Sequence, residues 1–334
     1  MKTLVTGGAG FIGSHAVVEL AQAGHTPVIL DNFCNSQESV LDGIEKILGY
    51  RPKTYVGDCA DPSFLESVFS RESVDGIIHF TALKSVGESL EKPLLYYRNN
   101  IDSLLAILDA ALRHNIKALV FSSSAVVYGE PDMLPIPETA PRKQATSPYG
   151  NTKQICEDIL RDVTQSVHGS LRSLSLRYFN PVGAHTSGLI GELPLGVPNN
   201  LVPYLTQTAA GQRERLTIFG GDYPTPDGTC IRDYIHVVDL ARAHIAALDH
   251  LLSAGDNQPL YDIYNVGTGH GTSVKELVDT FERVTGVLVP QSIGSRRPGD
   301  IASCYADPDK IRKELGWRAE LTLSQALKDA WKWQ

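Results

Sequence analysis

A glycine-rich turn near the N-terminus is the feature that most constrains how this chain folds. A strand-like run, Lys2–Thr6, precedes it, and an amphipathic helical pattern, Phe11–Ala23, follows it. Between them, glycines stand at three-residue spacing, at Gly7, Gly10 and Gly13. Without Cβ atoms, the backbone can turn tightly and approach the phosphates of a ligand closely. The turn therefore predicts a dinucleotide pyrophosphate at the N-terminus of the helix, where free N–H groups and the helix dipole favour anions.

Short apolar runs alternate with amphipathic stretches through the first half of the chain. The runs 28–30 and 119–121 are continuously apolar, as in strands covered on both faces. A second helical pattern spans Ile101–His114. This alternation predicts βαβ units, and hence a Rossmann-type, doubly wound parallel α/β sheet. We expect its strands at Thr3–Thr6, Thr26–Leu30, Lys53–Val56, Gly76–Phe80, Ala118–Ser122 and Ser173–Arg177.

The composition changes after Asn180, where prolines and glycines interrupt the regular alternation. Pro181, Pro194, Pro198 and Pro203 all fall in this stretch. We therefore expect a nucleotide-binding domain over residues 1–180 and a smaller, less regular α/β domain over 181–334 that binds the substrate. Some segments of the second half are expected to return and pack on the first domain.

An acidic residue, Asp31, ends the second predicted strand, where the ribose of a dinucleotide is expected. A carboxylate there accepts hydrogen bonds from both ribose hydroxyls and repels a 2′-phosphate. No Lys or Arg follows within Asn32–Ser36. The turn and the acid together predict NAD rather than NADP, and redox chemistry on a small molecule. The alternative is a glycine-rich loop without a ligand, with Asp31 as a turn carboxylate.

Charge and composition exclude several classes of protein. The net charge is −8, and the sequence has no basic run suited to nucleic acid. No apolar run approaches the ~20 residues that span a bilayer, and Met1 leads directly into a strand rather than a signal peptide. The five cysteines are scattered without a C-x-x-C pair, which favours a reducing cytoplasm and no metal site.

A tyrosine and a lysine at helical spacing are the candidate reacting groups. Tyr149 and Lys153 are four residues apart and share one helix face. A tyrosine base must ionise well below its ordinary pKa of about 10. A nearby ammonium and the positive nicotinamide ring of NAD⁺ both favour the phenolate. Such pairs also arise by chance, but this one follows a nucleotide turn and a strand ending at Ser122–Ser124.

Longer strings resemble the extended short-chain dehydrogenase/reductase family, and within it the nucleotide-sugar 4-epimerases, essentially from end to end. The most specific strings are Arg-Tyr-Phe-Asn-Pro-Val-Gly-Ala at 177–184 and Arg-Asp-Tyr-Ile-His-Val at 232–237. The glycine turn at 7–15, Lys-Ser-Val-Gly-Glu-Ser at 84–89 and Pro-Asn-Asn-Leu at 198–201 also match. The resemblance implies an NAD-dependent isomerase that takes UDP-hexoses and forms a homodimer through helices of the first domain.

The resemblance also implies roles for individual residues. Tyr149 would take the proton of the 4-hydroxyl, Lys153 would bind the nicotinamide ribose and lower the pKa of Tyr149, and Ser124 would bridge to the 4-oxygen. At the NAD site we expect Gly7, Gly10, Phe11, Ile12, Gly13, Asp31, Asn32, Asn35, Ser36, Asp58, Cys59, Phe80, Lys84, Asn99, Tyr149, Lys153 and Phe179. At the UDP-sugar site we expect Ser124, Asn180, Asn200, Leu201, Thr217, Phe219, Arg232, Arg297, Asp300 and Cys304.

Several of these residues have structural interpretations as well. Asp58 can be a turn residue, Lys84 a solvated surface lysine, and Arg232 and Arg297 members of surface ion pairs. Ser122 and Ser123 can simply line or cap the strand end. No metal is expected, because His79, His185 and His236 lack metal-ligand spacing.

The predicted reaction is the inversion of C4 of a UDP-hexose through a transient 4-keto sugar, with NAD bound throughout. Three alternatives remain open. One is another NAD-dependent nucleotide-sugar epimerase or a dehydratase, although Ala125 and Val126 after Ser124 are unsuited to the acid pair that a dehydratase needs. The second is a dehydrogenase that releases NADH. The third is a non-catalytic NAD-sensing protein, which would not need Tyr149, Lys153 and Ser124 together.

One departure from the family pattern concerns substrate range. Four residues after Asp300, where a tyrosine marks enzymes restricted to UDP-glucose and UDP-galactose, this chain has Cys304, with Tyr305 next. The smaller side chain predicts that UDP-GlcNAc and UDP-GalNAc are also interconverted. The alternative is that the alignment with the family is shifted by one residue, so that Tyr305 rather than Cys304 limits the space for the sugar.

Overall fold

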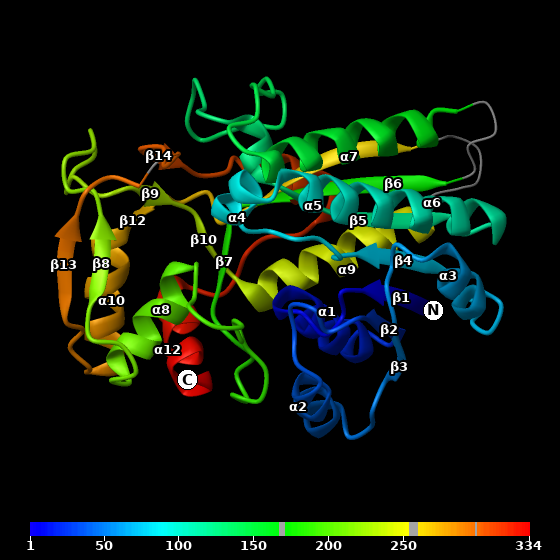
Figure 1. Ribbon diagram of the computed structural model, residues 1–334, viewed down its shortest axis with the longest axis horizontal. Helices are drawn as coiled ribbons and strands as arrows, with labels where there is room; N and C mark the ends of the chain where they lie inside the picture. The colour runs from blue at the N-terminus through cyan, green and yellow to red at the C-terminus, as the bar shows by residue number, and fades with distance from the viewer. Residues whose placement is uncertain (167–170, 254–259, 298) are drawn as a thin grey trace.

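A seven-stranded parallel sheet forms the centre of the molecule in a computed structural model that describes residues 1–166, 171–253, 260–297 and 299–334 (Figure 1). The strand order is β11-β6-β5-β4-β1-β2-β3. The strands are β1 Lys2–Thr6, β2 Thr26–Asp31, β3 Lys53–Val56, β4 Gly76–His79, β5 Ala118–Ser124, β6 Arg172–Tyr178 and β11 Tyr261–Val266. The predicted Rossmann-type sheet is confirmed, and each of the six predicted strands is present. Strand order reverses between β1 and β4, and such a reversal opens a crevice at the carboxyl ends of the strands.

Helices cover both faces of this sheet. One face carries α1 Phe11–Gln22, α2 Ser39–Leu48 and α9 Val237–Ser253. The other carries α3 Pro62–Phe69, α6 Ser103–Arg113 and α7 Pro148–Thr164, with α4 Val86–Glu91, α5 Pro93–Tyr97 and the π-helical turn η1 Arg98–Asp102 beside them. This double covering explains why the strand sequences are apolar on both sides.

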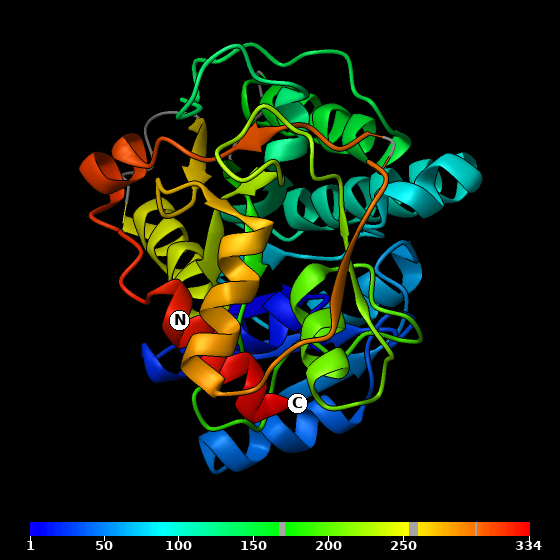
Figure 2. The ribbon, with the colours of Figure 1, turned by 90° about the vertical axis from the view of Figure 1, so that its left-hand side faces the viewer.

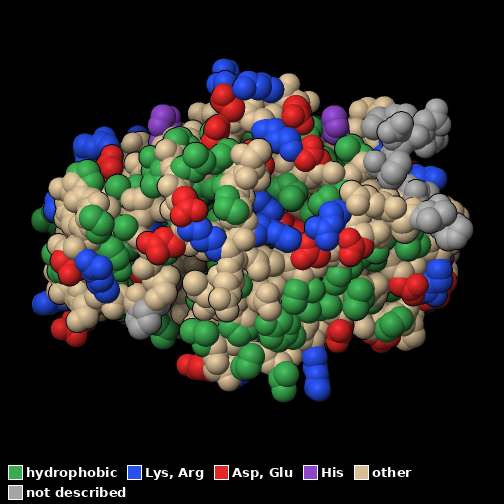
Figure 3. All heavy atoms as spheres, turned by 90° about the horizontal axis from the view of Figure 1, so that it is seen from above, with side chains coloured by type: hydrophobic (Ala, Val, Ile, Leu, Met, Phe, Trp, Pro, Cys, Tyr) green, Lys and Arg blue, Asp and Glu red, His purple; other side chains and the backbone are tan. Residues whose placement is uncertain are grey.

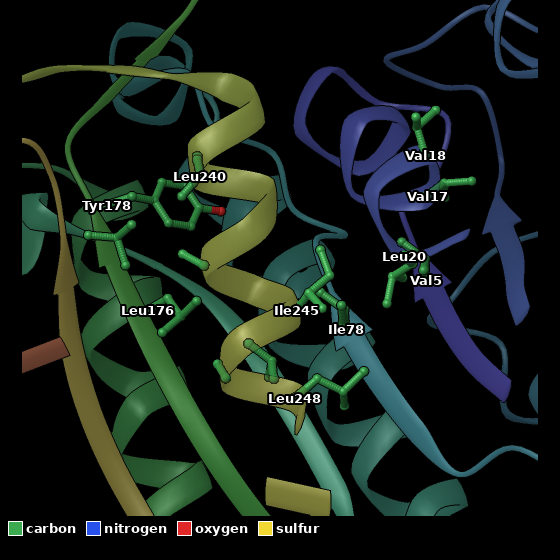
Figure 4. Close-up of a cluster of buried hydrophobic side chains, with 14 of the residues drawn as sticks. Val5, Val17, Val18, Leu20, Ile78, Leu176, Tyr178, Leu240, Ile245 and Leu248 are labelled. Carbon is green, nitrogen blue, oxygen red and sulfur yellow. The ribbon is translucent and has the colours of Figure 1, made fainter. Parts of the chain in front are cut away.

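Alternate residues of the central strands supply two separate cores. In β1, Leu4 packs with α3 and α6, whereas Val5 packs with α1 and α9. Figure 4 shows the second of these cores, in which Leu240 and Ile245 of α9 lie over the sheet near Leu176. α9 comes from the second half of the chain. The second half therefore contributes both a helix and the edge strand β11 to the layer formed by the seven-stranded sheet and its helices, called the first layer below.

The remaining segments build a smaller, less regular layer around α10 and α12 (Figure 2). Three small sheets pair β7 with β10, β8 with β13, and β9 with both β12 and β14. The strands are β7 Asn180–Val182, β8 Leu216–Phe219, β9 Ile231–Arg232, β10 Tyr234–His236, β12 Thr272–Ser273, β13 Gln291–Gly294 and β14 Ser303–Cys304. The helices of this layer are α8 Leu201–Ala209, α10 Val274–Thr285 and α12 Leu323–Trp333. Two other elements pack on the main sheet instead: α11 Asp309–Leu315 lies against β11 and α9, and the 3₁₀ turn η2 Ala125–Tyr128 lies against α7.

The described residues contain neither a membrane-spanning helix nor a metal-binding cluster. Among the helices that the structure describes, none combines the length and apolar character needed to cross a bilayer. Within the same described ranges, no cluster of three or more His, Cys, Asp or Glu side chains could hold a metal ion.

Candidate active site

The glycine turn has the geometry of a phosphate cradle. Gly7 has a positive φ of 69°, which L-residues rarely adopt. At Gly13 a Cβ would lie 2.1 Å from the Gly7 carbonyl oxygen, so only glycine fits. Gly10 is the N-cap of α1, and no side chain among the described residues caps that helix start. The first N–H groups of α1, on Phe11 and Ile12, are thus left to a ligand.

Asp31 is fixed beside this turn by three donors. Its carboxylate accepts hydrogen bonds from the Ala9 N–H at 2.9 Å, the Phe33 N–H at 2.9 Å and the Ser36 hydroxyl at 3.1 Å. A carboxylate held at the carboxyl end of β2 can accept from the hydroxyls of a ribose. The cradle and the acid together fit a dinucleotide, which would supply hydride acceptance and return when bound.

The other residues expected at the NAD site follow the carboxyl ends of neighbouring strands. Asp58 accepts the Ala60 N–H at 2.9 Å, a turn bond that its structural interpretation anticipated. Phe80 packs against His244 with the ring centroids 4.6 Å apart, and Lys84 pairs with Glu192. Cys59 and Phe179 are buried, and the Asn99 amide donates to Asn100 at 3.0 Å. Asn32 accepts the Cys34 N–H and so shapes the loop that also carries Asn35.

The candidate reacting groups meet between α7 and the end of β5. Ser147 caps α7 through the Gly150 N–H, and Pro148 begins the helix, so Tyr149 and Lys153 lie on its first turns. The Lys153 ammonium donates to the Ser122 carbonyl oxygen at 2.6 Å and lies 6.0 Å from the centroid of the Tyr149 ring. Ser124, the last residue of β5, also accepts the Val126 N–H.

Burial works against both charged forms in this pair. It lowers the pKa of Lys153 to about 8, partly opposed by Cys156 and Glu157. It raises the pKa of Tyr149, and a hydrogen bond with Ser124 opposes this in part. Desolvation therefore outweighs the other contributions at Tyr149 in the ligand-free chain. Lys153 donates to the backbone rather than to the phenol, and the expectation that its charge lowers the pKa of Tyr149 stays a prediction.

Behind this pair lies a buried ionic network. Glu157 accepts the Ser123 hydroxyl at 2.6 Å and two hydrogen bonds from Arg177, at 2.6 and 2.8 Å. The Ser122 hydroxyl pairs with Tyr178. Ser122 and Ser123 therefore tie the end of β5 to its neighbours, in keeping with their structural interpretation. Sequence reasoning missed Glu157, although its position one helical turn beyond Lys153 was a usable signal.

The residues expected to hold the UDP-sugar gather in the smaller layer. Arg297 forms two hydrogen bonds with Asp300, at 3.0 and 3.2 Å, and its guanidinium lies 5.7 Å from the centroid of the Phe219 ring. Arg232 approaches Asp300 at 3.8 Å and pairs with Cys304 across β9 and β14. Two arginines that share Asp300, one of them beside an exposed aromatic ring, suit an anionic, ring-containing ligand. The ion pairs of the structural interpretation are also present.

The remaining predicted substrate residues flank this group. Asn200 is the N-cap of α8, and Leu201 is the first residue of that helix. Thr217 lies on β8, next but one to Phe219. Asn180 begins β7 and donates its N–H to the Asp233 carbonyl oxygen at 3.0 Å.

The three histidines are held by other contacts. His79 bonds to Thr6 at 2.8 Å, and burial lowers its pKa to about 3. His185 bonds to Ser187 at 2.8 Å, and His236 pairs with Asp329 at 3.2 Å.

Comparison with known proteins places the chain in a family. The family model described as GDP-mannose 4,6 dehydratase matches residues 4–330. UDP-glucose 4-epimerase of Yersinia enterocolitica is 50% identical over 334 residues, which are 100% of this chain and 97% of that protein. The enzyme of Bacillus subtilis is 49% identical with the same coverage. The chain belongs to the UDP-glucose 4-epimerase family.

Solved structures of UDP-glucose 4-epimerases agree with this assignment. The enzyme of Bifidobacterium longum in complex with NAD⁺ and UDP has a TM-score of 0.95 and 48% identity, covering 100% of this chain and 98% of that one. The enzyme of Stenotrophomonas maltophila, with bound NAD and formylated UDP-arabinopyranose, has a TM-score of 0.95 and 49% identity over 100% and 97% of the two chains. The predicted family, fold, enzyme class and NAD cofactor are confirmed.

Within this epimerase, the turn after Ser124 bears on the dehydratase alternative. Ala125 is buried and Val126 is partly buried, and both are apolar residues of η2. Neither can donate a proton to a leaving hydroxyl. The dehydratase name attached to the matching family model thus describes the wider family.

Proposed function

We propose that this chain interconverts UDP-glucose and UDP-galactose by oxidising C4 to a ketone and reducing it again on the opposite face. The observation that carries the proposal is the convergence of Tyr149, Lys153 and Ser124 at the carboxyl end of β5, on the same sheet edge as the glycine turn that follows β1. NAD, when bound, supplies the acceptance and return of the C4 hydride. The net reaction is an isomerisation.

The side chains of the candidate site have separate tasks in this proposal. The Tyr149 phenolate takes the O4 proton as the C4 hydride leaves, and the phenol returns a proton to O4 when hydride comes back. Ser124 hydrogen-bonds both the sugar 4-oxygen and the phenol. Lys153 keeps a positive charge near the phenol and binds the nicotinamide ribose. Because the 4-keto sugar must present both faces, its ring is free to turn while UDP stays fixed.

The UDP part is proposed to lie between α8 and the arginine pair. The first N–H groups of α8 and the cations of Arg232 and Arg297 suit the two phosphates. The exposed ring of Phe219 offers a surface for the uracil. Residues Asn180, Asn200, Leu201, Thr217, Asp300 and Cys304 complete the proposed substrate site.

Incubation with UDP-galactose, followed by identification of the products, tests this proposal. We expect UDP-glucose, with equilibrium approached from either sugar. Accumulation of NADH in step with product would indicate a dehydrogenase instead, and a 4-keto-6-deoxy sugar would indicate a dehydratase. Binding of NAD without any product would indicate the NAD-sensing protein.

We also propose a wider substrate range, because Cys304 faces the reacting side of the site. Cys304 packs against the cluster that contains Phe179 and Ala125, whereas the Tyr305 ring lies against Gly271. Tyr305 follows β14, and its ring contacts Gly271 rather than that cluster. This arrangement supports turnover of UDP-GlcNAc and UDP-GalNAc.

The Cys304→Tyr variant tests the wider range. We expect kcat/KM for UDP-GalNAc to fall by about 100-fold, because the larger ring fills the space of the acetamido group. Activity on UDP-galactose should stay within about threefold, as the smaller sugar needs no such space. Tyr305→Phe is the matched control, and it should leave kcat/KM unchanged for both substrates. Equal loss on both substrates would contradict this role for Cys304.

Three further assignments are proposals of the same kind. Residues 1–180 would hold NAD and residues 181–334 the UDP-sugar, with α9 and β11 returning to the first layer. A cytoplasmic location is supported by five free cysteines.

A homodimer is supported by apolar side chains along the lower edge of the face in Figure 3, over α4 to α6. They are Leu90, Leu94, Leu95, Leu105 and Leu112, exposed by 37% to 69%.

A further inference from the structure

Glu192 lies in the segment between β7 and α8, and its backbone is held from two sides. Its carbonyl oxygen accepts the Trp333 indole N–H at 3.0 Å. At the preceding residue, Gly191, a Cβ would lie 2.4 Å from the same indole ring. Ile190 is fully buried in the core that also contains α2. The carboxylate of Glu192 is therefore presented from a fixed position.

One oxygen of this carboxylate accepts hydrogen bonds from two residues, one in the proposed NAD site and one in the proposed substrate site. Glu192 Oε1 accepts the Lys84 ammonium at 3.4 Å and the Asn200 side-chain amide at 2.5 Å. Lys84 follows β4 in the cofactor half and is 108 residues away in sequence. Asn200 begins α8 in the substrate half. The Glu192 side chain is 12% exposed, whereas its two donors, Lys84 and Asn200, reach it from the solvent side.

The contact with Asn200 changes what that residue does for its own helix. An asparagine at the N-cap ordinarily accepts an N–H of the first helical turn through its side chain. Asn200 is the N-cap of α8, yet among the described residues no side-chain cap is formed there. Its amide is directed to Glu192 instead. The N–H groups of Leu201 and Val202 thus remain open, and Pro203 has none to offer.

We propose that Glu192 is a positioning residue that turns Asn200 away from α8 and ties it to Lys84, so that the first turn of α8 stays open for the substrate diphosphate. The inference rests on the proposed function. Lys84 neutralises the carboxylate, so the arrangement directs no net negative charge at the phosphates. Because the Asn200 side chain is already held by Glu192, it needs less ordering when the ligand binds at this helix start.

Two substitutions at Glu192 separate this role from simple packing. In Glu192→Ala, Asn200 is free to cap α8, and we expect the Kd of UDP and the KM of UDP-galactose to rise about tenfold. In Glu192→Gln, the amide oxygen still accepts from Asn200, so we expect both values to stay within about threefold of the wild type. kcat should change by less than about threefold in either variant, since Glu192 does not touch the reacting atoms. Asp279→Ala is the control, because it too removes a carboxylate paired with a lysine, on the surface of α10.

A double-substitution cycle tests whether the effect passes through Asn200. In an Asn200→Ala background, Glu192→Ala should change the Kd of UDP by less than about twofold, because no amide is left to misdirect. Bound NAD and the thermal unfolding midpoint are measured for each variant, so that folding is known.

Three results would overturn the role of Glu192. They are a folded Glu192→Ala protein with an unchanged Kd for UDP, equal damage from Ala and Gln, or the same damage in the Asn200→Ala background. A wild-type chain that fails to bind UDP or convert UDP-galactose would refute the proposed function itself, and the role of Glu192 with it.

Discussion

Tyr149→Phe is expected to lower kcat for UDP-galactose by about 1,000-fold, because it removes the one group placed to exchange the O4 proton. The substitution keeps the ring, so the packing of α7 against β5 should survive. The Kd of UDP should stay within about threefold of the wild-type value, since other residues bind the UDP part of the substrate. Stopped assays with both sugars measure kcat, and titration with UDP measures binding.

The control for this variant is Tyr50→Phe, which removes the same hydroxyl from an exposed position. It should leave kcat unchanged. Retention of more than about a tenth of wild-type kcat in Tyr149→Phe would mean that another group moves the O4 proton.

Lys153→Met is expected to give the second largest loss, of about 100-fold in kcat at pH 7. In the ligand-free chain burial lowers the pKa of Lys153 to about 8 and raises that of Tyr149. Below pH 8 the ammonium is therefore the main form, and its charge favours the phenolate. Methionine is one atom shorter than lysine, so it keeps most of the apolar side chain beside Phe121 and removes the charge.

The pH dependence distinguishes an electrostatic role from a structural one. Without the ammonium the pKa of Tyr149 rises further, so the phenolate forms only at higher pH. The loss of kcat in Lys153→Met should accordingly be larger at pH 7 than at pH 9.5, with the acid limb of the profile moved to higher pH. An equal loss across pH 6 to 10 would show that Lys153 acts by placement alone.

The sheet was predictable because local patterns carry most of its information. Two of the six predicted strands contain continuous apolar runs, the other four were predicted from the alternation of short apolar segments with helical patterns, and glycines mark the nucleotide turn. The seventh strand, β11, was missed. It lies at the sheet edge, where Tyr261, Asp262 and Ile263 are only partly buried, and its sequence mixes polar with apolar residues. An edge strand is covered less, so the apolar signal is weaker.

The packing of α9 shows a second limit. Its contact with α1 joins parts of the chain more than 200 residues apart, and Arg242 of α9 donates to Glu19 of α1 at 2.9 Å. An amphipathic pattern indicates that a helix has a buried face, but it does not indicate which layer that face covers. We expected some segments of the second half to pack on the first domain, but the sequence did not indicate that α9 would be one of them.

The candidate site likewise contains residues that the sequence indicates and residues that it does not. Motifs marked the residues expected to meet ligands, such as Tyr149 and Arg232. They did not mark Glu157 or Glu192, whose roles depend on partners brought together by folding. Nor could they reveal that burial raises the pKa of Tyr149 in the ligand-free chain, because desolvation depends on what packs around the phenol.

The central claim is that hydride leaves C4 and returns to the same sugar while NAD stays bound. It is tested most directly with UDP-galactose carrying deuterium at C4, incubated with the purified chain and an excess of unlabelled NAD and NADH. The account predicts UDP-glucose that keeps its deuterium at C4, with no label in the free dinucleotide. Loss of deuterium from C4, or its appearance in free NADH, would contradict the account.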